Sequence, residues 1–304
     1  MSKVSRWSML VLGGALALAP VLEARTCAGN SDVIGAYGWY GTRAPQFVPA
    51  PADPPVTPIN GSATPIGAFA AAAQNSAAFS LIGRIYTDGN GGIFASASAT
   101  APVLQVGTYV ANSDCTISAT ITDTFATPAE AFLTPIQASA KFEGVIVQGG
   151  NEVDLVQSTG VRGTTLIWRK TRQYNGCSTE GFTGTFGFTA SGQITSSVAT
   201  DGSDTPTVTV APFSVSGRFV PDGTGKFVQD SLALTSPLTT RQFTGTYAVN
   251  ADCTGTGTLV DSTGKSRKIT FVIISNGTGA NPQSGVFFSF TDATVSGAGL
   301  AQQQ

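Results

Sequence analysis

The chain of 304 residues contains no histidine. Histidine is the most common general base in enzymes and the most common metal ligand, so its absence excludes a Ser-His-Asp triad and the usual zinc sites. No G-x-S-x-G nucleophile motif is present, and Leu259 occupies the place of the first glycine of a phosphate-binding loop that would end in the GKS at 264–266. We therefore expect no catalytic residues, no bound metal and no cofactor.

Charged side chains are scarce as well. They make up 11% of the chain, and the net charge at pH 7 is −2. This composition disfavours long salt-bridged helices and favours short β-strands joined by turns. Because no basic surplus is present, nucleic acid is not an expected partner.

Long apolar runs are lacking except near the N-terminus. Lys3 and Arg6 precede the run MLVLGGALALAPVL, and Ala24 is a small residue suited to cleavage. This layout is typical of a secretory signal peptide, and the run is short and interrupted for a membrane span. We expect residues 1–24 to be removed and the mature protein to be secreted, periplasmic or attached to the cell surface, without a transmembrane span.

Much of the sequence occurs twice in similar form. Four stretches recur in the same order: GAYGW at 35–39 and GTFGF at 184–188, FSLIGRIYTDGNGG at 79–92 and FSVSGRFVPDGTGK at 213–226, GTYVANSDCTISATI at 107–121 and GTYAVNADCTGTGTL at 245–259, and KFEGVIV at 141–147 and KITFVII at 268–274. Self-similarity of this kind indicates a tandem duplication. It predicts one unit at residues 25–172 and a second at 173–304.

Each unit shows the pattern of antiparallel strands. Phe213, Val215, Gly217 and Phe219 alternate with polar residues, and Asp-Gly turns follow such runs, as in half-buried hairpins. The first unit has about eight such strands by these signals: 35–40, 79–87, 92–99, 104–112, 116–123, 138–147, 151–157 and 163–171. We therefore predict an all-β fold of two tandem antiparallel up-and-down β-barrels, with β-sandwiches as the alternative.

The connections between these strands differ in length. The even-numbered ones are tight turns, whereas the odd-numbered ones at 41–78, 124–137 and 190–211 are long. In an up-and-down barrel the two sets lie at opposite ends, so each unit should have a closed end and an open end. A proline-rich insertion at 44–75 belongs to the open end of the first unit and should be an extended arm.

The four cysteines divide evenly between the units. Cys27 and Cys177 precede the first strand, and Cys115 and Cys253 lie in the turn after the fourth. These positions fall at the closed end, so an exported protein should form disulfide bonds Cys27–Cys115 and Cys177–Cys253. The aspartate before each second cysteine is expected to form the turn rather than to bind a ligand.

The combination C…GTFGF…DGTG…GTYAVNADCTG…KITFVII resembles a group of uncharacterised secreted bacterial proteins that carry one such unit after a signal peptide. The first copy departs from the motif at Ile117, where the second has Gly255. The group is similar in expected shape to lipocalin-like and allene-oxide-cyclase-like barrels. The resemblance implies a fold and brings no activity and no catalytic residues.

Three carboxylates are the remaining candidates for chemistry. Glu152 and Asp154 share a face of one predicted strand, and Glu143 lies on the strand before it. Together they have the chemistry to hold Ca²⁺ or to perform acid–base catalysis. A solvated strand face that discourages aggregation is the competing interpretation, because the second copy lacks all three acids.

Two arginines occupy equivalent positions in the units. Arg84 and Arg218 stand opposite the apolar face of their strands, so they should project outward, and an anion site inside the barrel is the alternative. Tyr37, Trp39 and Phe186 lie on the first strands and should be core aromatics.

These observations favour an exported, non-catalytic binding or cell-envelope-associated protein. Its partner would be a small apolar ligand or a component of the cell envelope. One alternative is a barrel enzyme of the isomerase type that works through carboxylates or confinement. Another is a structural or adhesive spacer.

Overall fold

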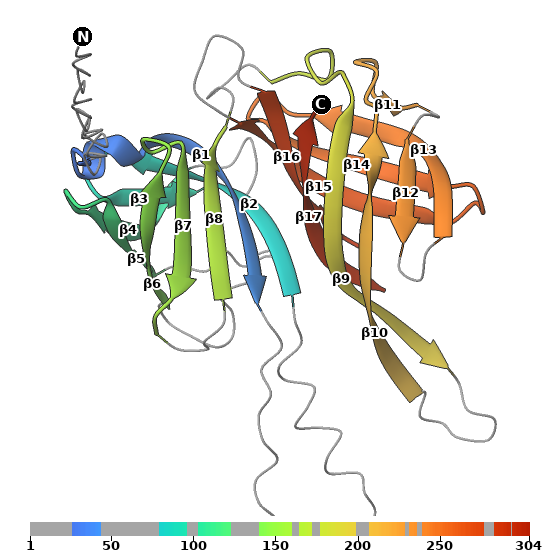
Figure 1. The fold of residues 1–304 in the computed structure, drawn as a ribbon, viewed down its shortest axis with the longest axis horizontal. Coiled ribbons are helices and arrows are strands. Elements are labelled where there is room, and N and C mark those ends of the chain that lie inside the picture. The colour runs from blue at the N-terminus through green and yellow to red at the C-terminus, as the bar shows by residue number, and fades with distance from the viewer. Residues whose placement is uncertain are drawn as a thin grey trace, which may run out of the picture.

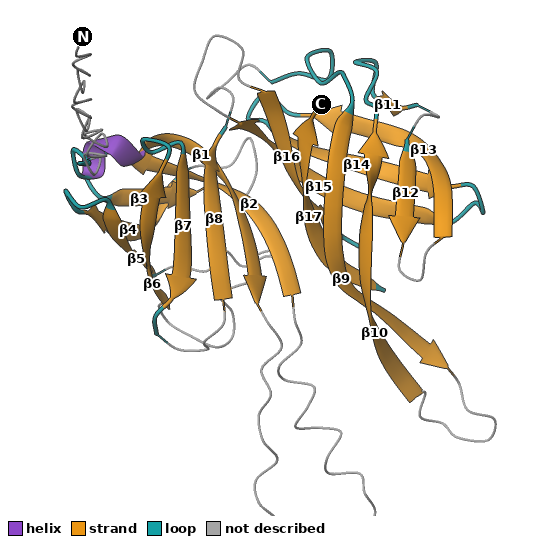
Figure 2. Ribbon diagram, viewed as in Figure 1, coloured by secondary structure: helices purple, strands orange, loops and turns teal. Residues whose placement is uncertain are grey.

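The structure, a computed structural model, describes residues 26–43, 79–95, 103–122, 140–159, 164–171, 177–198, 207–228, 231–235, 239–276, 283–292 and 294–304. The predicted signal peptide, the proline-rich insertion at 44–75 and the connection at 124–137 lie outside these residues. Within them the fold is almost entirely β, and the one helix is a short 3₁₀ turn, η1 (Asn30–Val33) (Figure 2).

Among the described residues of the first unit, eight antiparallel strands form a closed barrel. They are β1 (Ile34–Arg43), β2 (Phe79–Asp88), β3 (Gly92–Ala95), β4 (Leu104–Ala111), β5 (Thr116–Ile121), β6 (Ala140–Val147), β7 (Glu152–Gln157) and β8 (Thr164–Lys170). Each strand pairs with the next along the chain, and β8 returns to β1. The predicted barrel is confirmed, and its strands begin and end within a few residues of their predicted bounds, with β3 ending earliest, at Ala95.

The second unit is a curled antiparallel sheet beside the first barrel (Figure 1). Its described strands are β9 (Phe186–Val198), β10 (Thr207–Phe219), β11 (Lys226–Phe227), β12 (Leu232–Thr235), β13 (Thr239–Val249), β14 (Thr254–Asp261), β15 (Ser266–Asn276), β16 (Gln283–Phe290) and β17 (Val295–Gln303). The strand order is β11-β13-β12-β10-β9-β17-β16-β15-β14, and additional pairing between β13 and β14 joins the curl. We call this unit the second barrel.

The predicted long connection at 190–211 is wrong for most of its length. Strands β9 and β10 continue as a paired hairpin as far as Val198 and Thr207, so only residues 199–206 join them. The hairpin extends beyond the other strands of the sheet (Figure 1). Alternating Thr and Val residues favour strand over loop here, and the prediction gave too much weight to Ser, Asp and Gly in the same stretch.

The repeated N-x-D-C stretch forms the same turn in both barrels. In the second barrel the Cys253 backbone N–H donates to the Asn250 carbonyl, and Asp252 Oδ1 accepts from the backbone and hydroxyl of Thr254. Asp114 accepts from Thr116 in the same way in the first barrel. The aspartates are therefore turn formers, as predicted.

Large side chains pack inside the first barrel. Its inner face carries an apolar cluster in which Tyr37, Phe142 and Trp168 are at most 1% exposed. The Tyr37 hydroxyl donates to the Gly150 carbonyl at 2.6 Å, which satisfies its buried polar atom. The prediction of core aromatics is confirmed for Tyr37 and Phe186, while Trp39 is partly buried and packs against the core.

The two barrels pack against each other through the outer faces of β1, β2 and β8 on one side and β15 to β17 on the other. The apolar contact is formed by Tyr40, Ile82, Ile167, Val272, Ile274, Phe287 and Leu300. Tyr40 stacks on Phe287 with ring centroids 5.6 Å apart. At Gly38 the strands approach so closely that a Cβ atom would lie 2.7 Å from Ile274 Cγ2. Glycine is therefore required there by the neighbouring barrel.

Candidate functional site

The second barrel contains a cavity of about 160 Å³. Among the described residues that line it, eight are phenylalanines and five are smaller apolar residues. The rings pack on one another around its wall, as Phe219 does on Phe227 at a centroid distance of 5.7 Å and Phe188 on Phe288 at 5.8 Å, both edge to face. A wall of interlocked aromatic rings is stiff and strongly apolar.

The two barrels differ in side-chain size where the first strand of each faces the last. In the first barrel Trp39 on β1 faces Trp168 on β8. At the corresponding pair in the second barrel, Phe188 on β9 faces Ala301 on β17. Phe188 lines the cavity, and Ala301 is fully buried in the apolar core of the same barrel.

Four charged residues line the rim of the cavity, namely Arg241, Asp261, Lys265 and Arg267. Arg241 lies two residues before inward-facing Phe243 on β13, and Arg267 lies two residues before inward-facing Ile269 on β15. Since side chains alternate across a strand, both arginines occupy inward positions at the rim. The rim and the Cys253 turn lie at opposite ends of the barrel. Strand β13 begins and β14 ends at the rim, whereas the Cys253 turn joins the other ends of these two strands.

Asp261 is held in place by hydrogen bonds within this rim. Its Oδ1 accepts from the backbone N–H groups of Thr263 and Lys265 and from the Thr263 hydroxyl. Its Oδ2 accepts from Arg241 Nη1 at 2.9 Å. Burial acts to raise the pKa of Asp261, but the hydrogen bonds from Thr263, Lys265 and Arg241 outweigh it and lower the pKa to about 2. The carboxylate is therefore ionised at neutral pH.

Arg267 also lies near a carboxylate, that of Asp292, but at a longer distance than Arg241 lies from Asp261. Its Nη1 lies 4.0 Å from Asp292 Oδ2, which is longer than a hydrogen bond. The same carboxylate accepts from the backbone N–H of Lys268 at 3.2 Å. Asp292 is thus engaged by the strand backbone, and the guanidinium of Arg267 remains close to the cavity rim.

The three predicted carboxylates do not converge. Strand pairing places Glu143 opposite Val156, and Glu152 binds Arg169 with an oxygen–nitrogen distance of 2.6 Å. Burial raises the pKa of Asp154, and Glu152 adds to this while Arg169 opposes it. Among the described residues, no group of three acidic, histidine or cysteine side chains is placed to hold a metal ion. Glu143 is exposed, but the side chain of Glu152 is 14% exposed and Asp154 is partly buried, so the solvated-face interpretation holds for Glu143 alone.

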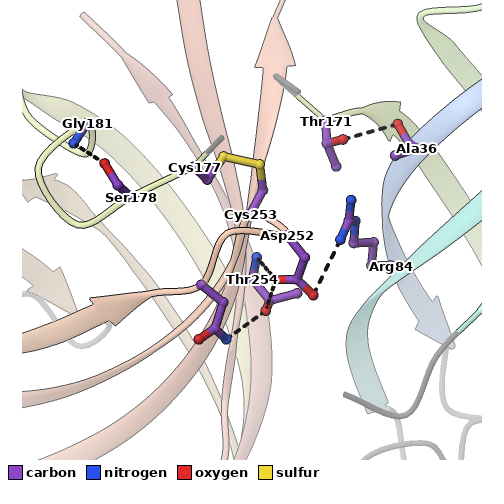
Figure 3. The surroundings of a disulfide bond; sticks show 10 residues. Ala36, Arg84, Thr171, Cys177, Ser178, Gly181, Asp252, Cys253 and Thr254 are labelled. Carbon is purple, nitrogen blue, oxygen red and sulfur yellow. Dashed lines mark hydrogen bonds and ion pairs between the residues drawn. A yellow bond between two sulfur atoms is a disulfide. The ribbon is translucent and has the colours of Figure 1, made fainter. Parts of the chain in front are cut away.

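The two arginines point outward, as predicted. Arg84 lies on the outer face of β2, where its guanidinium meets Asp252 of the second barrel (Figure 3). Arg218 lies exposed on β10. The alternative of an anion site at Arg84 or Arg218 inside the barrels is therefore wrong. The GKS sequence at 264–266 forms the β14–β15 turn, with Gly264 at a φ of 81°, and begins no helix.

The four cysteines form two disulfide bonds. Cys27 is bonded to Cys115 and Cys177 to Cys253, which is the predicted pairing (Figure 3 shows the second bond). The bridges tie the segment before each first strand to the β4–β5 turn in the first barrel and to the β13–β14 turn in the second. They leave no free thiol among the described cysteines.

Sequence reasoning missed Arg241 and Arg267. The signal was available, because extending the alternation of Phe243, Gly245 and Tyr247 backwards, or that of Ile269 and Phe271, gives an arginine on the inner face of each strand. The cavity that these arginines border depends on the volumes of side chains from several strands, so alternation along one strand does not reveal it.

No protein-family model matches the chain, and no curated protein matches its sequence. Within the described residues, no helical segment has the length and apolar character needed to cross a bilayer.

Proposed function

We propose that this chain is an exported, non-catalytic binding protein that holds a small apolar ligand in its second barrel. The observation that carries the proposal is the phenylalanine-walled cavity of about 160 Å³. An apolar cavity of roughly 150 Å³ in a protein core is large enough to bind benzene. A ligand whose apolar part has the size of one aromatic ring therefore matches the hollow, and a longer ligand would extend through the charged rim.

The first barrel supports a different role within the same protein. Among its described residues the interior carries a buried apolar cluster that includes Trp168 and Phe142, and its outer face packs on the second barrel. We propose that the two units are copies of one ancestral lipocalin-like barrel, of which the first now serves as a rigid support. The matching turns and disulfide bonds support this origin.

Export is supported by the two disulfide bonds. Such bonds persist in oxidising compartments and are rare in the cytosol. Together with the predicted signal peptide at residues 1–24, they favour a secreted, periplasmic or cell-surface protein. A component of the cell envelope is a suitable source of the ligand.

The enzyme alternative finds little support at the cavity. Asp261 is the one carboxylate among the described lining residues, and its low pKa keeps it ionised. A general acid or base works best with a pKa near the operating pH. Binding without chemistry therefore accounts better for this lining.

Binding of a neutral probe tests the proposal. Phenylbutanol, titrated calorimetrically into the mature protein, should bind with one site per chain. Ala233 lines the cavity, so Ala233→Phe should fill it and abolish binding. Thr244→Phe is the control, because Thr244 is exposed on the outer face of β13, away from the cavity lining, and the change should leave binding intact. Failure of the unaltered protein to bind, or equal binding by Ala233→Phe after circular dichroism shows it folded, overturns the proposal.

A further inference from the structure

We propose that the ligand of the second barrel is an organic anion, with a ring-sized apolar body inside the cavity and a carboxylate at Arg241, Lys265 and Arg267. This inference rests on the proposed binding function and adds the chemical class of the ligand. It is carried by the charge at the rim, by the depth of the arginines and by a contrast between the two barrels.

The rim has a surplus of positive charge. Among the described residues that line the cavity, three are cationic and one is anionic, and Asp292 is a second acid, 4.0 Å from Arg267, so the surplus is one positive charge. The anion, Asp261, already accepts from Arg241 and from its own turn. A carboxylate on the ligand would bring the charges of this rim closer to balance and would add an acceptor for the guanidinium groups.

The arginines lie where such a contact is strong. The side chain of Arg267 is 22% exposed and that of Arg241 is 38% exposed, so both are partly removed from water. An attraction between opposite charges grows as the surrounding dielectric constant falls. An anionic group that sits at the mouth of an apolar cavity therefore gains more than one on an open surface.

The first barrel has no arginine at the corresponding positions. Counting back from the GTY sequence of each unit, the position of Arg241 corresponds to Val103, and counting back from KITFVII and KFEGVIV, Arg267 corresponds to Ala140. The closed barrel of the first unit forms without these cations, so the barrel fold itself does not require them.

Three probes with the same apolar body test the charge preference. Phenylbutyrate, phenylbutanol and phenylbutylamine carry an anionic, a neutral and a cationic group. We expect phenylbutyrate to bind about tenfold more tightly than phenylbutanol, the size of effect that one hydrogen bond to a charged group produces. Phenylbutylamine should bind most weakly. Added NaCl should weaken the binding of phenylbutyrate and leave that of phenylbutanol unchanged.

Two rim variants should change the preference in opposite directions. Arg267→Gln should lower the affinity for phenylbutyrate about tenfold with no change for phenylbutanol. Asp261→Asn keeps an Oδ1 acceptor for the turn and removes the negative charge, so it should raise the affinity for phenylbutyrate severalfold. Lys226→Gln is the control, because it removes one positive charge from the exposed surface at the other end of the barrel.

The possible outcomes distinguish the anion preference from the binding function on which it rests. Equal binding of phenylbutyrate and phenylbutanol overturns the anion preference and leaves the binding function standing. Absence of binding for all three probes overturns both. If Arg267→Gln does not fold, the probe series and its salt dependence on the unaltered protein decide alone, and a phenylbutyrate affinity insensitive to salt counts against the inference.

Discussion

Arg84 on the first barrel and Asp252 on the second form an ion pair in which Nη1 and Oδ2 lie 3.3 Å apart (Figure 3). Their side chains are 6% and 13% exposed, so the pair is largely buried between the barrels. Asp252 uses its other oxygen to close the N-x-D-C turn. One carboxylate therefore shapes a hairpin and also joins two units of the fold.

This pair leads to a stability prediction. Asp252→Asn keeps the turn acceptor and removes the negative charge that faces the buried guanidinium. Breaking a buried ion pair from one side costs about 3 kcal/mol. We expect the free energy of unfolding in urea to fall by that order. Asp114→Asn is the matched control, since Asp114 forms the same turn but lies exposed, and its effect should be much smaller. Equal losses in both variants would show that the turn, not the pair, matters.

The close approach at Gly38 gives a prediction about the contact between barrels. A Cβ atom there would lie 2.7 Å from Ile274 and 2.9 Å from Val272, both of which are buried. Gly38→Val should therefore push the barrels apart and lower the stability by about 2 kcal/mol or more. Calorimetry should resolve two melting transitions in place of one. Thr120→Val, on the outer face of β5, should leave the melting profile unchanged, and an unaltered profile for Gly38→Val would contradict the packing.

The disulfide bond of the second barrel gives a third prediction. Cys177 and Cys253 are separated by 76 residues, so in the chain-entropy model their bond stabilises the folded state by about 4 kcal/mol. The double variant Cys177→Ser, Cys253→Ser should melt at a clearly lower temperature. Peptide mapping without reductant should still find Cys27 joined to Cys115. A variant that melts like the unaltered protein would mean that the bond adds nothing to this barrel.

The lowered pKa of Asp261 predicts that the stability of the folded protein depends on pH. Its folded-state pKa of about 2 lies below the ordinary value of 3.8, so the folded protein favours the ionised form. The stability from this group is therefore present above about pH 4 and is lost as the pH falls towards 2. Urea unfolding across this range should show the unaltered protein more stable than Asp261→Asn near neutral pH, with the difference shrinking on acidification. A difference independent of pH would contradict the hydrogen bonding at the rim.

The sequence by itself determined the strands and the pairing of the cysteines in disulfide bonds. Phe213, Val215 and Phe219 alternate with polar residues, and a period of two places them on one face whatever the rest of the chain does. Asn250, Asp252 and Thr254 bond to one another within a few residues, so their turn is local chemistry. Once the strands and turns are known, the closed ends bring each pair of cysteines together.

Where residues typical of turns and residues typical of strands occur together, the sequence pattern did not determine the local structure. At 190–211 the turn-forming residues of the tip masked two strands: β17 pairs with β9 only as far as Ile194, and beyond it β9 pairs with β10 as far as Val198. Arg84 was correctly placed outside the barrel, but its partner lies on the other unit, far along the chain.

Only the tertiary structure decided that the second barrel holds a cavity and what lies at its mouth. Tyr37 and Phe186 occupy equivalent positions in similar sequences, and alternation places both in an apolar core. Whether that core encloses a cavity depends on the side-chain volumes of all the strands added around the ring. Alternation is a property of neighbours along the chain, whereas a void and the charges that gather at its rim are properties of residues that meet only after folding.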